Sequence, residues 1–96
     1  MDITKTITDT KAVIKLNGWL DTKTTPELAE VIEALPAGID GITLDLGELE
    51  YISSAGLRQI VAMHKRVSGN LTIVNAGSEL MQLFKMTGFD KKLKFE

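Results

Sequence analysis

The hydrophobic pattern switches several times between a period of two residues and a period of three to four. Positions 12–17 alternate apolar and polar residues, as in a strand with one buried face, and positions 42–46 do so most clearly. Positions 3–7 predict a weaker first strand and positions 71–74 a further one, while 92–95 alternate like a short last strand. The chain is therefore expected to mix strands and helices within one domain.

Three segments between these strands have helical spacing. The first is expected to begin at Thr25 as its N-cap, with Pro26 at the first helical position, where a missing N–H costs nothing. The second and third follow Ser54 and Ser78. The apolar stripe predicted for the second helix consists of Leu57, Ile60, Val61, His64 and Val67.

The order of these elements predicts an α/β fold. The short gap between the first two strands favours an antiparallel hairpin, whereas each strand–helix–strand crossover makes its two strands parallel. Polar residues alternate on every strand, so helices are expected mainly on one face of the sheet. We therefore expect residues 1–96 to form a single two-layer domain with a mixed sheet of four to five strands.

Composition narrows the possible functions. The absence of cysteine excludes disulfides, thiolate catalysis and cysteine zinc sites, and a net charge of -2 gives no basic face for nucleic acid. The N-terminus lacks the apolar core of a signal peptide, and no apolar run approaches the roughly 20 residues that span a bilayer. We expect a soluble cytoplasmic protein that does not insert into a membrane.

Little in the chain suggests an enzyme. The single histidine, His64, lies at helical spacing with apolar residues, where a packed histidine is commoner than a catalytic base. No glycine-rich phosphate loop is present, and Glu48 and Glu50 are interpreted as solvated loop charges. We therefore expect no enzymatic activity, no metal and no cofactor.

A strand-to-helix junction carries two serines, Ser53 and Ser54, followed by Ala55 and Gly56. Glycine in a helix costs about 1 kcal/mol relative to alanine, so Gly56 indicates close approach by another backbone or by a partner. From the residues alone, Ser54 is first of all an N-cap. A helix N-terminus also favours a phosphate, so phosphorylation of Ser54 is a compatible second interpretation.

The run from Tyr51 to Arg58, Tyr-Ile-Ser-Ser-Ala-Gly-Leu-Arg, resembles the STAS family, which sulfate transporters and anti-sigma factor antagonists share. Three other stretches resemble the same family in the same order: residues 16–21, 25–28 and 83–89. The resemblance covers essentially the whole chain. It implies a STAS-like fold and a binding function without catalysis.

The resemblance to the antagonists also implies roles for particular residues. Their phosphorylated serine aligns with Ser54, and their acidic partner-contacting residue aligns with Asp21. Ser53 stands where many antagonists have aspartate and Ala55 where they have serine or threonine, which leaves Ser53 as an alternative acceptor. The implied partners are an anti-sigma factor that is also a serine kinase, and a cognate phosphatase.

The expected contact surface combines the loop at residues 20–24, the junction at 53–56 and the outer face of the second helix. Its residues are Asp21, Thr22, Ser53, Ser54, Ala55, Gly56, Arg58 and Met63, the last as an exposed apolar contact. We expect a monomer or a weak dimer. The alternative function is a STAS subunit that never cycles, such as a component of a lipid-transport ATPase or a signalling scaffold.

Overall fold

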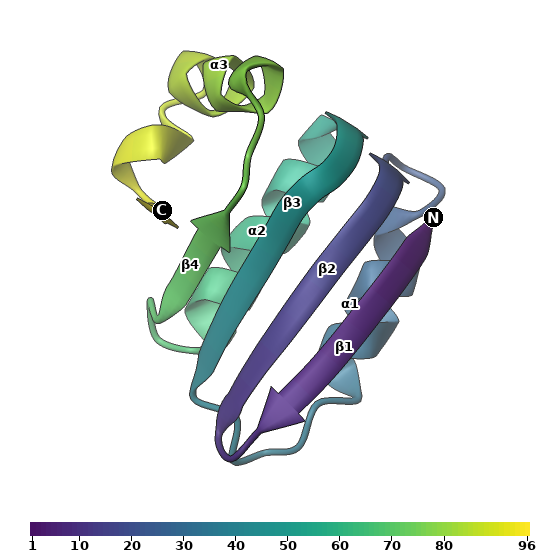
Figure 1. The fold of residues 1–96 in the computed structure, drawn as a ribbon, viewed down its shortest axis with the longest axis vertical. Coiled ribbons are helices and arrows are strands. Elements are labelled where there is room, and N and C mark those ends of the chain that lie inside the picture. The colour runs from purple at the N-terminus through teal and green to yellow at the C-terminus, as the bar shows by residue number, and fades with distance from the viewer.

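A five-stranded sheet organises the computed structural model, which describes residues 1–96 (Figure 1). The strands are β1 (Asp2–Thr8), β2 (Lys11–Leu20), β3 (Gly41–Ile52), β4 (Leu71–Val74) and β5 (Lys94–Phe95). The helices are α1 (Thr25–Glu33), α2 (Ser54–Arg66), α3 (Ser78–Met86) and the short 3₁₀ helix η1 (Phe89–Lys91). The strands lie in the order β1-β2-β3-β4-β5, with β1 antiparallel to β2 and every other pair parallel. The predicted α/β fold with a mixed sheet is confirmed.

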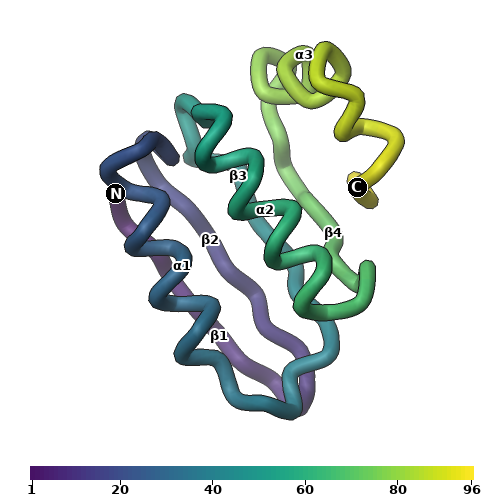
Figure 2. Tube along the Cα trace, turned by 180° about the vertical axis from the view of Figure 1, so that it is seen from behind, coloured from purple at the N-terminus to yellow at the C-terminus, as the bar shows by residue number.

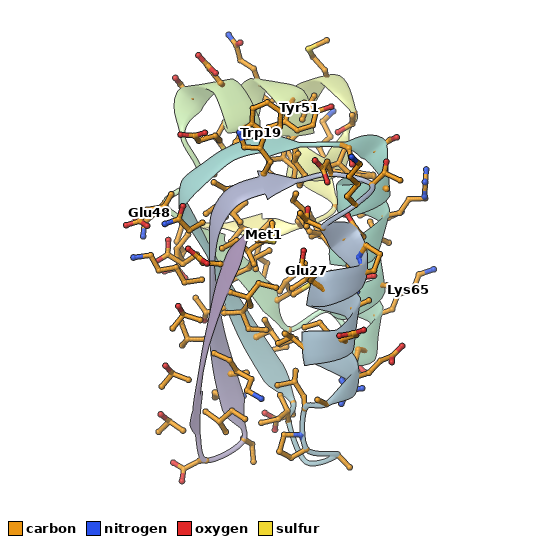
Figure 3. All side chains as sticks on the ribbon, turned by 90° about the vertical axis from the view of Figure 1, so that its right-hand side faces the viewer. Met1, Trp19, Glu27, Glu48, Tyr51 and Lys65 are labelled. Atoms are coloured by element: carbon orange, nitrogen blue, oxygen red, sulfur yellow. The ribbon has the colours of Figure 1, made fainter.

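The helices leave one face of the sheet open. α1 and α2 lie side by side across the same face, and α3 sits beyond the end of the sheet at which β3 finishes (Figures 1 and 2). Seen from the side, strands and helices form two layers (Figure 3). None of the helices combines the length and the apolar character that crossing a bilayer requires.

The alternation predicted for the strands accounts for the core. In β2, Ala12, Ile14 and Leu16 are fully buried, while Val13 between them is 45% exposed on the open face. Leu44 of β3 and the other inward strand residues join the apolar sides of the helices in one cluster of 22 buried hydrophobic residues. No polar or charged side chain is buried. Burial of apolar surface between the two layers therefore holds the fold together.

Both β2 and β3 are longer than the sequence predicts. Their parallel pairing continues to the contact between Leu20 and Ile52, but the register shifts between Lys15 and Asn17 and again between Gly18 and Trp19. Such irregularities interrupt the alternation of faces, so the pattern of apolar residues does not reveal the last third of either strand.

The buried side of α2 differs from the predicted stripe. Met63 is fully buried and belongs to the core, so its prediction as an exposed partner contact is wrong. The stripe follows the spacing of four, three and four residues through Gly56, Ile60, Met63 and Val67, which leaves Val61 and His64 only half-buried. Helical geometry places residues at this spacing on one face.

Gly56 packs against the protein's own sheet. A Cβ atom at this position would lie 2.8 Å from Leu20 Cγ and 3.0 Å from Ile52 Cγ1. Since Gly56 is also buried, the close approach that the sequence indicated is made by the protein's own side chains, and a contact of Gly56 with a partner stays a prediction. The missing side chain allows the first turn of α2 to approach the ends of β2 and β3.

Candidate functional site

Ser53 lies between β3 and α2 and is the N-cap of this helix. Its backbone is extended, with φ -92° and ψ 172°, and its Oγ accepts a hydrogen bond from the N–H of Gly56 at 3.2 Å. Ser53 N–H donates to the carbonyl of Leu20 at 2.8 Å, which continues the pairing of the two strands. The expectation that Ser54 caps this helix is therefore wrong. The helix begins directly after the strand pairing ends, one residue earlier than expected, so the cap position falls on Ser53.

Ser54 is the first residue of α2 and is exposed. Its hydroxyl forms no hydrogen bond within the protein, because the side-chain bond at this helix end belongs to Ser53. The N–H groups of Ser54 and Ala55 precede the first intrahelical donor and find no partner in the helix. The Ser54 hydroxyl is thus accessible and is not needed for capping.

The loop after β2 is organised by Asp21 and Thr24. Asp21 Oδ1 accepts hydrogen bonds from the N–H groups of Lys23 at 2.9 Å and Thr24 at 3.0 Å. Thr24 Oγ1 accepts from the N–H of Asp21 at 2.9 Å and lies 2.7 Å from the carbonyl oxygen of Trp19, to which it donates. These bonds make Thr24, and not Thr25 as predicted, the residue that precedes α1, and Pro26 becomes its second residue.

These contacts keep Asp21 ionised. The hydrogen bond from the Thr24 N–H is the main cause that lowers the pKa of its carboxyl group, with a further contribution from the N–H of Lys23; partial desolvation opposes them. Oδ2 accepts no hydrogen bond from the protein. One oxygen of Asp21 therefore fixes the loop, and the other is available to a second molecule.

The structure brings most of the predicted contact residues to one end of the molecule. The loop with Asp21 and Thr22 follows β2, the junction with Ser53 and Ser54 follows β3, and these two strand ends are neighbours in the sheet. Arg58 lies one helical turn beyond Ser54 and is exposed. Of the predicted set, only Gly56 and Met63 face the core.

Two aromatic residues at this end were not predicted as part of the site. Trp19 is 55% and Tyr51 45% exposed, and their ring centroids are 5.5 Å apart (Figure 3). The indole N–H of Trp19 donates to Glu50 Oε2 at 3.0 Å. Each aromatic residue stands two positions before a predicted site residue, Asp21 or Ser53, which is the sequence signal that would have found them.

A hollow of about 400 Å³ lies between the end of β3, the start of α2 and α3. Its lining residues are Glu50, Tyr51, Ile52, Ser53, Ser54, Leu57, Glu79, Leu80, Leu83 and Thr87. The lining contains two carboxylates and no cation. No group of three or more histidine, aspartate or glutamate side chains is arranged to hold a metal ion. The arrangement places the exposed hydroxyl of Ser54 beside a hollow lined by apolar residues and two carboxylates.

The family model described as Mlab, STAS domain, matches residues 3–94. The chain belongs to the STAS family. It is 31% identical over 93 residues to BtrV of Bordetella bronchiseptica, which is named as a candidate anti-sigma factor antagonist; the match covers 93% of this chain and 80% of BtrV. It is 32% identical over 92 residues to the anti-sigma-B factor antagonist of Staphylococcus aureus, covering 92% and 85% of the two chains.

A solved structure agrees with this assignment. The anti-sigma factor antagonist from Mycobacterium paratuberculosis superposes with a TM-score of 0.85 at 24% identity, over 98% of this chain and 83% of the other. The STAS fold that the sequence motifs implied is thereby confirmed. Both relatives are named as anti-sigma factor antagonists, which are non-enzymatic regulators, and the expectation of a non-enzymatic STAS protein similar to them is confirmed.

Proposed function

We propose that this STAS domain is a cytoplasmic partner-switching protein that binds a serine-kinase anti-sigma factor and is controlled by phosphorylation at Ser54. The observation that carries the proposal is the division of roles between the two serines. Ser53 accepts the capping hydrogen bond, while the Ser54 hydroxyl is exposed and has no partner. A modification of Ser54 therefore leaves the local structure intact.

The chemistry of the switch follows from the position of Ser54. A kinase transfers the γ-phosphoryl group of ATP to Ser54 Oγ, releasing ADP and the hydroxyl proton; a phosphatase restores the hydroxyl by hydrolysis. The phosphate adds roughly -1.5 to -2 charges at neutral pH. The free N–H groups and the dipole of α2 tolerate this charge, so the fold stays unchanged while the binding surface does not.

The surface around Ser54 supports a protein partner. Asp21 keeps one carboxylate oxygen free, and the exposed rings of Trp19 and Tyr51 belong to the same two strand ends. Tyrosine and tryptophan often supply much of the binding energy at protein interfaces. A phosphate placed next to such a surface would have to be desolvated on association, which is costly.

The test compares wild type with Ser54→Ala and with Ser53→Ala as the matched control, each incubated with the cognate kinase and ATP. Intact mass should show one added phosphoryl group on wild type and on Ser53→Ala, and none on Ser54→Ala. Ser54→Asp should bind the partner of the unphosphorylated form more weakly than Ser54→Ala does. Phosphorylation of Ser54→Ala to the wild-type level would refute the proposal.

One departure from the antagonist pattern favours a second candidate function. Ser53 replaces the aspartate, and Ala55 the serine or threonine, that flank the acceptor in many antagonists. In this second function the chain is a STAS subunit that forms a stable complex and never cycles between phosphorylated and unphosphorylated forms. Intact mass of the protein purified from its native cells separates the two, because this second function predicts no phosphorylated form under any growth condition.

A further inference from the structure

A second hollow lies further along α2, between this helix and η1. Its volume is about 370 Å³, and we call it the α2–η1 groove. Its lining residues are Arg58, Val61, Ala62, Lys65, Phe89 and Lys92. Three of these residues are cationic and none is acidic, the reverse of the hollow beside α3.

The cations of the α2–η1 groove are not used by the fold. The only side-chain ion pairs of the protein are Lys11 with Asp40 and Lys15 with Glu48. Neither pair includes a residue of this groove. Arg58, Lys65 and Lys92 are all exposed without a carboxylate partner, and Lys65 extends outward from the helix layer in Figure 3. Three free cations around one hollow form a positive patch on a chain whose net charge is -2.

The apolar part of the groove argues for a peptide rather than a small anion. Val61 and Phe89 are half-buried and Ala62 is exposed, so the groove contains accessible apolar surface between the cations. A free phosphate or sulfate gains nothing from such surface. A segment with apolar residues on one side and carboxylates beside them uses both parts of the groove.

We propose that the α2–η1 groove binds an acidic amphipathic segment of the partner protein. Its apolar side chains pack on Ala62 and Phe89, and its carboxylates face Arg58, Lys65 and Lys92. The proposal rests on the proposed function, because it names the chemistry of the partner that the Ser54 switch controls.

The position of Arg58 connects the groove to Ser54. The two residues are four positions apart on α2 and both are exposed, so their side chains are neighbours on the helix surface. A phosphate on Ser54 would neutralise Arg58 and repel the carboxylates of the bound segment. Phosphorylation would therefore weaken the complex without any change in the fold.

The test is a titration of the ¹⁵N-labelled protein followed by two-dimensional NMR. The probe is a capped synthetic peptide with leucines at helical spacing and glutamates between them; the control peptide has glutamine in place of every glutamate. The acidic peptide should shift the amide signals of residues 58–65 and 89–92. It should bind several-fold more tightly than the glutamine peptide, and high salt should remove the difference.

Matched variants locate the effect. The double variant Arg58→Gln/Lys65→Gln should lower the affinity for the acidic peptide by about three- to tenfold, which is what two exposed ion pairs contribute. Lys5→Gln/Lys85→Gln makes the same change of charge elsewhere on the surface and should leave the affinity unchanged. Equal weakening by both pairs, equal binding of both peptides, or shifts confined to other residues would overturn the proposal.

The result is independent of the test of the proposed function. Peptide binding uses the unmodified protein and needs no kinase. A Ser54 that is never phosphorylated would refute the switch while the groove still binds the acidic peptide. Conversely, phosphorylation of Ser54 in a protein that does not bind the acidic peptide would refute the groove and leave the switch intact.

Discussion

The adjacent hydroxyl groups of Ser53 and Ser54 are in different chemical situations. Ser53 is half-buried and its hydroxyl oxygen accepts a hydrogen bond from the N–H of Gly56, whereas Ser54 is exposed and its hydroxyl has no partner. A single residue of offset thus separates a structural serine from a modifiable one. The consequence is measurable in the stability of the protein.

Replacing Ser53 by alanine should lower the free energy of unfolding by about 1 kcal/mol, because the Gly56 N–H loses its acceptor. Ser54→Ala, the matched control, should change it by less than about 0.5 kcal/mol, as is usual for exposed positions. Urea denaturation followed by circular dichroism measures both. A larger loss for Ser54→Ala than for Ser53→Ala would show that the capping assignment is wrong.

Gly56 is the residue on which the packing of α2 depends most directly. Gly56→Ala should destabilise the protein by about 1–3 kcal/mol, because the new methyl group would overlap Leu20 and Ile52 in the core. This outweighs the gain of about 1 kcal/mol that alanine has over glycine in a helix.

A second glycine provides the control for this change. Gly38 has an ordinary φ, and a Cβ atom added there would meet no other atom within 4 Å, so Gly38→Ala should be neutral or slightly stabilising. Thermal unfolding of the two variants beside wild type gives the comparison. A Gly56→Ala protein as stable as Gly38→Ala would mean that the first turn of α2 can move away from the sheet at no cost.

At the scale of elements, the loop between β2 and α1 depends on one ionised carboxyl group. The pKa of Asp21 in the folded protein lies below its ordinary value of 3.8, so the unfolded chain takes up this proton at a higher pH than the folded chain. The stability that Asp21 supplies is therefore fully present above about pH 4 and is lost as the pH falls through the folded-state pKa.

Asp21→Asn should accordingly lower stability at neutral pH and have a smaller effect near pH 3, where this group is already largely protonated in the unfolded chain and part of the stabilisation is lost. Asp2→Asn serves as the control, since Asp2 is exposed and forms no side-chain hydrogen bond. Urea midpoints at the two pH values provide the test. An equal loss for Asp21→Asn at both values would show that the hydrogen bonds of the loop do not depend on the charge.

The elements also show which part of the fold the sequence could predict. Alternation in 12–17 and 42–46 identified the central strands, because one face of each is buried against helices. The pairing beyond Asn17 was not predictable, because two register shifts break the alternation that signals a strand. The buried stripe of α2 was predicted wrongly at Met63. The orientation of the helix depends on Gly56, and a glycine has no apolar side chain that would indicate burial in the sequence.

At the scale of the whole molecule, opposite charges are gathered at two places along α2. Glu50 and Glu79 line the hollow beside α3, whereas Arg58, Lys65 and Lys92 line the α2–η1 groove. The acidic hollow includes Ser54 in the first turn of α2, and the basic groove begins one turn further on, at Arg58. The net charge of -2 could not predict this arrangement, because tertiary packing brings residues far apart in the sequence to the same hollow.

The neighbouring strand ends explain why motifs located most of the candidate site. Asp21 and Ser53 follow parallel strands that end side by side, so a motif after each strand necessarily marks the same region of the surface. Trp19 and Tyr51 were not predicted because they belong to the irregular last third of each strand. There the pattern of apolar residues does not show which face of the sheet a side chain lies on.

The exposed indole of Trp19 gives the molecule a built-in optical reporter. It is the only tryptophan of the chain, so all of the tryptophan fluorescence comes from the end of the sheet next to Asp21 and Tyr51. Its emission depends on how much water surrounds the ring, and 55% of the residue is exposed in the free protein. A partner that covers this end of the sheet should therefore shift the emission maximum of the unlabelled protein. A partner that binds elsewhere should leave the maximum unchanged.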